Sequence, residues 1–193
     1  MEQEIQDISI QRIQEAIPHL QGIDNELIID YTEYTMPNDK HPIHRYPIRF
    51  DGLYIGLREK GKARFSINLK EFEVGANDLV ICSPDDLVQA TLQNDNHLVQ
   101  SMVVSSHFLK EMYISLNSFM PFFAARKDHP VFHLTDDEVK ELKSYFMLIK
   151  ENVVSDDYFR LDTTKRLLAA YLYKLGSILY RHRPELQAEA SKP

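Results

Sequence analysis

The sequence predicts a mainly β protein with added α-helices: a small barrel or sandwich of short strands, followed by two long C-terminal helices. Two observations predict it. Between residues 50 and 104, short apolar stretches recur roughly every ten residues with turn residues between them, which is typical of barrels and sandwiches. After residue 135, apolar residues recur three and four positions apart instead, which is the helical period.

The strand pattern is clearest on either side of Gly61. Before it, Leu53, Ile55 and Leu57 alternate with other residues. After it, four apolar residues alternate with polar ones over 62–70, and they are Ala63, Phe65, Ile67 and Leu69. A period of two indicates a strand with one buried face. Further strands are predicted over 27–34, 79–82, 88–92 and 98–104.

Capping residues and apolar spacing predict the helices. Thr135 with Glu138 three residues on forms a capping box. Apolar spacing predicts a short helix from about residue 8 to 17, and Ser105 or Ser106 is expected to cap another. The first long helix has an apolar stripe made of Val139, Leu142, Phe146, Ile149 and Val153. The second follows a break at 155–157, and its stripe is Leu161, Thr164, Leu168, Tyr171, Leu175 and Ile178.

Composition limits the function. The 193 residues carry a net charge of −7 and a single cysteine, Cys82. An acidic chain repels the phosphate backbone, so this chain alone is not expected to bind DNA. One cysteine excludes an internal disulfide. The acidic N-terminus lacks the layout of a signal peptide, and no apolar run is long enough to span a bilayer, so a cytoplasmic location is expected.

Catalytic and metal-binding signals are weak. The close histidine pairs, His41 with His44 and His129 with His133, lie in proline-containing loops with no cysteine nearby, whereas a zinc site needs about four converging ligands. Cys82 lies in an apolar strand, where a thiol is inert. Neither a phosphate-binding glycine loop nor a nucleophile elbow is present. We therefore expect no catalytic residues, no metal and no cofactor.

A small-molecule site inside the barrel is the remaining hypothesis, because small barrels can enclose one ligand. Alternation alone leaves open which face of each strand lines the interior. The polar candidates for ligand contact are Tyr54, Arg58, Arg64, Gln89, His97 and Gln100.

The long helices predict a homodimer. Their stripes match either a helix-pair seam or ordinary packing on the barrel. Because the second helix carries additional apolar residues beside its stripe, we expect it also to meet a partner. The interface is predicted to consist of Leu161, Leu168, Tyr171, Leu175 and Ile178.

The order of elements resembles the N-terminal regulatory domain of AraC-type bacterial transcription regulators, from about Leu27 to Arg183. The segment FDGLYIGLREKGKARFSINLKEFEVGANDLVICSPDDLVQ is especially similar to versions common in Bacteroides. The residues that carry the resemblance are Gly61, Ser66-Ile67-Asn68-Leu69, Gly75, Asn77, Leu79 and Pro84.

The resemblance implies an arm at 1–26, a cupin-like (double-stranded β-helix) barrel at 27–104, a helical dimerisation region at 105–183 and a linker at 184–193. It implies a small-molecule effector, possibly a sugar, and DNA binding only through a C-terminal helix-turn-helix domain that is absent from this sequence. A truncated regulator is therefore expected.

Enzymatic cupins differ from this sequence at their metal ligands. They carry a His-x-His pair and a glutamate near the first hairpin and a later histidine, whereas here the hairpin reads Tyr54-Ile-Gly-Leu-Arg58-Glu59 and the later region offers Gln89. This departure argues against cupin metal chemistry. A free-standing cupin that binds or modifies a small molecule such as a sugar remains the alternative.

Overall fold

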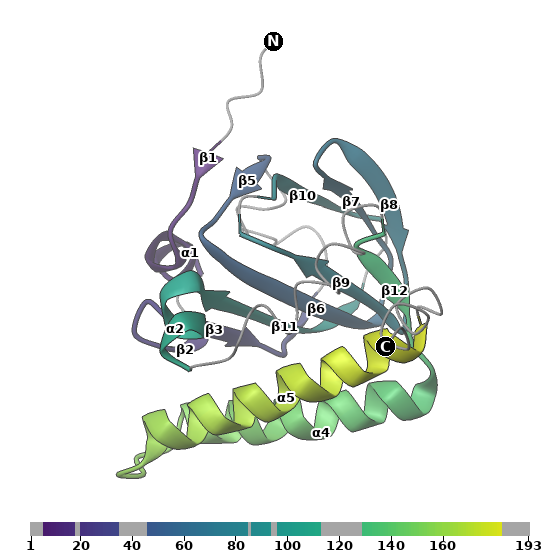
Figure 1. Ribbon diagram of the computed structural model, residues 1–193. Coiled ribbons are helices and arrows are strands. Elements are labelled where there is room, and N and C mark those ends of the chain that lie inside the picture. Colours follow the sequence, from purple (N-terminus) through teal and green to yellow (C-terminus); the bar gives the residue numbers. More distant parts are fainter. Residues whose placement is uncertain are drawn as a thin grey trace, which may run out of the picture.

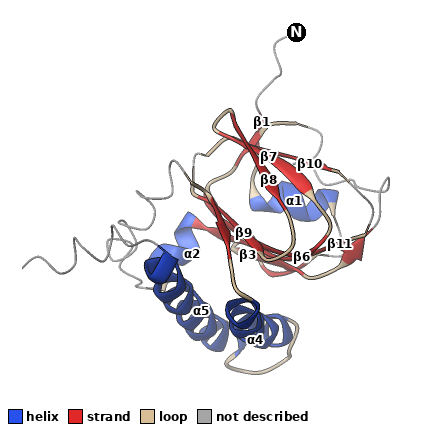
Figure 2. Ribbon diagram, turned by 90° about the vertical axis from the view of Figure 1, so that its right-hand side faces the viewer, coloured by secondary structure: helices blue, strands red, loops and turns tan. Residues whose placement is uncertain are grey.

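The computed structural model describes residues 6–17, 20–34, 46–84, 86–93, 96–112 and 129–182. These residues form three layers, namely one β-sheet, a second sheet that faces it, and two long helices on the back of the second sheet (Figure 1). Figure 2 shows from the side that both helices cover the same sheet. The predicted linker at 184–193 lies outside the described residues.

The first sheet, sheet A, has five strands in the order β1-β5-β10-β7-β8. Its pairs are antiparallel except for β1 with β5, which is parallel. The strands are β1 (Gln6–Asp7), β5 (Ile48–Arg49), β10 (Val88–Leu92), β7 (Ala63–Ile67) and β8 (Lys70–Val74).

The second sheet, sheet B, has seven strands in the order β12-β9-β6-β11-β3-β2, with β4 also paired to β11. Its long central strands are β6 (Gly52–Lys60) and β11 (His97–Ser105). The others are β12 (Val131–His133), β9 (Asp78–Cys82), β3 (Leu27–Asp30), β2 (Gln21–Ile23) and β4 (Glu33–Tyr34).

Four helices are described. The short ones are α1 (Ile10–Ala16) and α2 (Ser106–Glu111), and the long ones are α4 (Asp136–Val153) and α5 (Arg160–His182). Two predicted caps are confirmed: the Ser105 hydroxyl accepts from the Phe108 amide at the start of α2, and Thr135 forms the capping box with Glu138 at the start of α4. No helix in the described part of the chain is long and apolar enough to cross a membrane.

The predicted fold class, mainly β with two long C-terminal helices, is confirmed, with one difference. The described strands form two separate sheets that pack face to face, and hydrogen bonds do not close them into one barrel. The predicted boundaries also separate elements that pair or pack together. Ile13 of the arm packs into the core between the sheets, and β12 of the helical region pairs with β9 of the barrel region.

One predicted strand residue is wrong. Leu69 does not extend the apolar face of β7 but lies with Asn68 in the turn to β8, where both have positive φ (70° and 50°). Positive φ at both central residues is the geometry of tight hairpin turns. The Leu69 side chain is consequently 84 % exposed.

Two apolar cores follow from the layers. The inner core lies between the sheets and includes Ile13, Phe65, Val88 and Cys82. The outer core lies between sheet B and the helices and includes Leu57, Met102 and Phe146. Sheet B is therefore buried on both faces.

Most of the stripe predicted to form the dimer interface packs inside the same chain. Leu168, Tyr171, Leu175 and Ile178 are all buried in the outer core. Burial raises the pKa of the Tyr171 hydroxyl, so it stays protonated. Of the predicted interface residues only Leu161, 44 % exposed, is open to a partner. The expectation that the other four meet a second chain is corrected, because the sheet and α4 already cover them.

A buried carboxylate ties the start of α4 to the end of α5. Glu138 accepts from the Thr135 amide (3.0 Å) and Arg181 (3.1 Å), and lies 2.9 Å from His182 Nε2. Burial alone would raise its pKa, but these hydrogen bonds outweigh burial and lower the pKa to about 2. The ionised form is thus the one that the fold stabilises.

We predict that Glu138→Gln lowers the free energy of unfolding by roughly 2 kcal/mol at neutral pH, because an amide can still cap α4 but carries no charge for Arg181. The folded-state pKa of Glu138 (about 2) is below its ordinary value of 4.5. The difference between wild type and variant should therefore be complete above pH 4.5 and disappear as pH falls toward 2. Urea unfolding at a series of pH values measures it.

The control is Asp137→Asn, since Asp137 is almost fully exposed on the same helical turn. It should change stability by less than about 0.5 kcal/mol. A Glu138→Gln deficit that stays constant between pH 7 and pH 3 would contradict the assignment.

Candidate functional site

Alternation along β6 divides its side chains between the two cores. Leu53, Ile55 and Leu57 belong to the outer core under the helices. Tyr54 packs against the inner core, and Gly56 and Arg58 share its face because successive residues of a strand point to opposite sides. Tyr54 and Arg58, both predicted ligand contacts, therefore lie on the face between the sheets.

The central feature of this face is a buried pair, Arg58 and His97. Arg58 is 3 % exposed and His97 is 0 % exposed. The Arg58 Nη1 group lies 2.9 Å from His97 Nδ1 and also approaches the Lys60 carbonyl oxygen at 3.4 Å. A guanidinium group can only donate, so Nδ1 is the acceptor and the imidazole proton is on Nε2. Residues far apart in sequence thus place a cation and a neutral imidazole together in the interior.

Two glycines make space for side chains on this face, Gly56 for Tyr54 and Gly61 for His97. A Cβ on Gly56 would lie 2.3 Å from the Tyr54 hydroxyl, so the tyrosine ring extends along β6 toward Arg58. A Cβ on Gly61 would lie 2.5 Å from His97 Nδ1, and Gly61 has φ +84°. Sequence reasoning identified Gly61 only as a turn and missed Gly56, although a glycine inside a strand signals close approach of another group.

Arg64 and Gln89 lie elsewhere. Ala63, Phe65 and Ile67 of β7 fill the inner core, so Arg64 points to the outer surface of sheet A, where it bonds Glu73 at 2.8 Å. Gln89 is paired across the ladder with Ser66, on that same outer side. Neither can join a site between the sheets, which corrects those two predicted contacts.

Gln100 points to the helices and belongs to a polar cluster that the sequence did not reveal. Its Nε2 donates to Glu59 at 2.6 Å. Glu59 also accepts from Lys143 of α4 at 2.8 Å and from the Tyr31 hydroxyl at 3.3 Å. We call these four residues the Glu59 cluster. No periodic pattern predicts it, because its members come from β6, β11, α4 and the residue after β3.

A β-bulge separates the pair from the cluster. Val99 is opposite Arg58, but Leu98 is opposite Lys60, so Glu59 is an extra residue on β6. A bulge breaks the regular ladder and redirects side chains, and bulges are frequent beside functional sites. Here the bulged residue, Glu59, is the centre of the Glu59 cluster and directly follows Arg58 in the strand.

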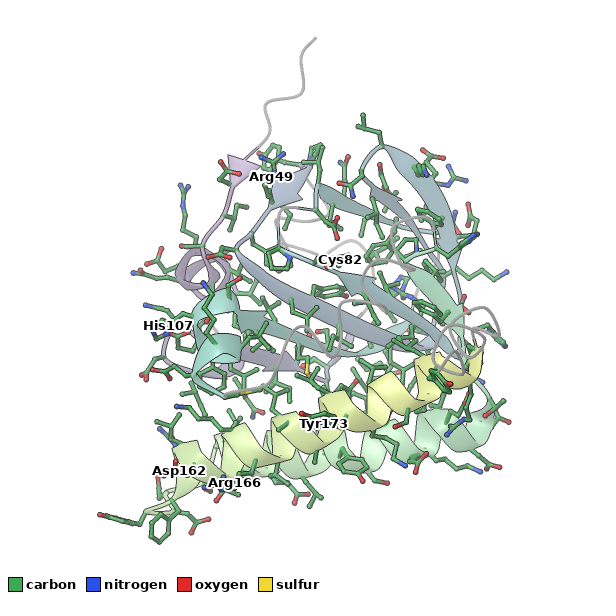
Figure 3. All side chains as sticks on the ribbon, in the orientation of Figure 1. Arg49, Cys82, His107, Asp162, Arg166 and Tyr173 are labelled. Carbon is green, nitrogen blue, oxygen red and sulfur yellow. The ribbon has the colours of Figure 1, made fainter. Side chains whose placement is uncertain are left out.

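Metal-ligand geometry is absent from the described part of the chain, where no three His, Cys, Asp or Glu side chains converge. His133 is exposed and bonds Asp78 at 2.8 Å, and His41 and His44 lie outside the described residues. Cys82 is buried in the inner core, near the middle of the molecule in Figure 3.

Comparisons with known proteins return structures rather than sequences. No protein-family model and no curated protein matches the chain. An apo ToxT variant from Vibrio cholerae is 11 % identical over 81 % of this chain and 58 % of its own, with a TM-score of 0.48. The AraC-like transcriptional activator CuxR is 13 % identical over 80 % of this chain and 52 % of its own, with a TM-score of 0.46.

Cupins are also among the similar structures. A cupin 2 conserved barrel domain protein from Leptotrichia buccalis is 11 % identical over 45 % of this chain and 39 % of its own, with a TM-score of 0.36. The neighbours of the chain are thus AraC-like regulators and cupins, all at low identity, and the chain spans little more than half the length of those two regulators.

We predict that Gly61→Ala destabilises the protein by about 1–3 kcal/mol, because the new methyl group forces His97 to move and alanine disfavours positive φ. Thermal unfolding measures the loss, and the NMR signals of the His97 ring should shift. Gly75→Ala is the matched control, since a Cβ there meets nothing closer than 3.8 Å and the backbone needs no positive φ. Equal effects of the two substitutions would show that Gly61 makes no space for His97.

Proposed function

We propose that this chain is the effector-sensing domain of a cytoplasmic transcription regulator. In this proposal a small molecule binds between the sheets at Tyr54, Arg58 and His97, and the long helices pass its presence to a DNA-binding domain outside this sequence. The observation that carries the proposal is the buried Arg58–His97 pair on one face of sheet B, with α4 and α5 packed on the other face. A signal has to cross only one sheet.

The chemistry of the pair favours binding over catalysis. Guanidinium N–H groups, a tyrosine hydroxyl and an imidazole can hold oxygen atoms of a ligand. A sugar or a sugar acid offers such oxygen atoms, and the apolar residues of the inner core provide the remaining wall that small-ligand sites require. Of the similar structures, one is described as ToxT with bound unsaturated fatty acid, so an effector with an acidic group belongs in the same test.

The alternative is a free-standing cupin that binds or modifies a small molecule. The residues at the positions of the cupin metal ligands favour binding without catalysis. Arg58 is a cation, and it lies on the hairpin where enzymatic cupins have their metal-ligating residues. We therefore propose that the chain is not an enzyme. Recovery of an unchanged effector after incubation with the protein supports this, and its conversion to a product favours the alternative.

Ligand binding is tested by thermal shift with a panel of sugars, sugar acids and fatty acids. A ligand present at about 100 times its Kd stabilises the folded state by about 2.7 kcal/mol. We predict that the active compound raises the unfolding temperature of wild type and of Arg64→Gln, but not of Arg58→Lys. A shift that Arg58→Lys retains and Arg64→Gln loses would move the site to the outer face of sheet A.

Dimerisation remains part of the proposal but needs a different surface. Four exposed apolar residues cluster at the α4–α5 turn and the start of α5, and they are Val154, Tyr158, Phe159 and Leu161. The other large apolar residues exposed in the described part of the chain are Tyr46, Leu69, Leu148 and Tyr173. The rings of Tyr158 and Phe159 stack edge-on at 4.8 Å. An exposed apolar cluster of this kind marks interfaces, and a symmetric pair is the commonest assembly.

We predict a homodimer at micromolar concentration that Phe159→Glu with Leu161→Glu converts to a folded monomer, because charges at a buried interface are costly. Leu69→Glu is the control, since Leu69 is an even more exposed apolar residue (84 %) but lies on the hairpin of sheet A. By contrast, Leu168→Glu with Leu175→Glu should unfold the chain. Light scattering and circular dichroism separate the cases, and a monomeric wild type would refute the dimer.

A further inference from the structure

We infer that strand β6 relays the state of the Arg58–His97 pair to helix α4 through Glu59 and Lys143. The inference deepens the proposed sensing function and rests on it in one respect, namely that the pair is where the effector binds. It concerns the path across sheet B, which the proposed function leaves open.

The first argument is adjacency with opposite orientation. Arg58 and Glu59 are neighbours on β6, yet Arg58 bonds His97 between the sheets and Glu59 bonds Lys143 beneath the helices. Both groups are shielded from water, with the Glu59 side chain only 17 % exposed. A displacement of the backbone at Arg58 therefore moves the carboxylate that α4 contacts.

The second argument is that the pairing of β6 with β11 is interrupted at Glu59. Glu59 is the extra residue of the bulge and has no cross-strand partner on β11. A bulge disrupts the ladder only locally, and on the other side of β6 the Arg58 carbonyl still accepts from the Asn77 amide at 2.8 Å. On β11, Gln100 donates to Glu59 and lies three residues after His97. Both strands that carry the inner pair therefore also meet at Glu59.

The third argument is that Lys143 is held in place on the helix side. Its ammonium group donates to Glu59 and Tyr31 and lies 4.9 Å from the centroid of the Tyr31 ring. The Tyr31 ring packs edge-on against Phe146 of α4 at 5.9 Å. Burial alone would lower the pKa of Lys143, but its hydrogen bonds to Glu59 and Tyr31 leave that pKa raised. Lys143 therefore stays charged and paired with Glu59.

The fourth argument concerns direction. Leu142, Phe146 and Ile149 pack α4 on sheet B through apolar contacts, which are non-directional and allow small sliding. The Glu59–Lys143 ion pair is directional and joins α4 to β6. A second polar contact, from the Asn77 side-chain amide to Asp136 at 2.6 Å, joins the start of α4 to the residue before β9. At its start α4 is tied to the end of α5 through Glu138 and Arg181. A shift of α4 therefore reaches the C-terminal end of α5.

The test is a double-mutant cycle that needs no ligand. His97→Leu removes the acceptor for Arg58, and Lys143→Met removes the ammonium group but keeps the apolar stem. Amide hydrogen exchange of residues 142–149 is the readout. We expect His97→Leu to speed this exchange at least threefold in the wild-type background but less than about 1.5-fold in the Lys143→Met background, because coupled residues are not additive.

Two controls show that the coupling is specific. His97→Asn keeps an oxygen acceptor near the position of Nδ1 and should restore exchange close to the wild-type rate. Lys140→Met removes a lysine one turn earlier on α4 that is 76 % exposed and pairs only weakly with Asp137 (3.5 Å). In that background His97→Leu should keep its full effect. If His97→Leu does not fold, Arg58→Lys replaces it, since it keeps the charge but shortens the reach.

Equal fold-changes in the wild-type and Lys143→Met backgrounds would overturn the relay. Because the cycle contains no ligand, this result would not decide whether an effector binds, which the thermal-shift experiment tests separately. Conversely, strong coupling with no stabilising compound would keep the relay and reject the proposed binding function.

Discussion

Burial of sheet B on both faces is the constraint on which the rest of the structure depends. Each residue of a strand serves only one face, so every polar side chain on β6 must find its partner on the side where it lies. Arg58 does so with His97 between the sheets, and Glu59 does so with Lys143 under the helices. The same constraint makes β6 a direct link between the inner core and α4, through the adjacent residues Arg58 and Glu59.

Local signals in the sequence were sufficient for the elements that carry their own pattern. The alternation of Ala63, Phe65 and Ile67 placed one face of β7 in the core, and Thr135 with Glu138 marked the start of α4. The strands β1, β2, β5 and β12 were missed because two or three residues have no periodicity. They exist only because a partner strand is already in place. The five-residue strand β8 was missed as well, because most of its residues are polar and exposed.

The site was harder to predict for a related reason. A strand buried on both faces is apolar on both, so the run from Leu53 to Leu57 did not show which side faced inward. That His97 meets Arg58 depends on the register between β6 and β11, which no local pattern encodes. The wrong prediction of Arg64 as a ligand contact could have been avoided. The alternation in its own strand already showed that the even-numbered positions are polar and face away from the core. The stripe of α5 looks the same whether a sheet or a second chain covers it.

The inner pair is a place where stability has not been maximised. A buried arginine is costlier than an apolar side chain of similar volume, and a glycine within a strand, as at Gly56, weakens it. Leucine at position 58 would suit a purely structural core better, whereas glycine at position 56 is the residue that leaves room for the Tyr54 ring. Departures of this kind, where a local rule is broken without a gain in packing, are expected at functional positions. That is the physical reason to seek the effector at Arg58 and His97 rather than in the well-packed outer core.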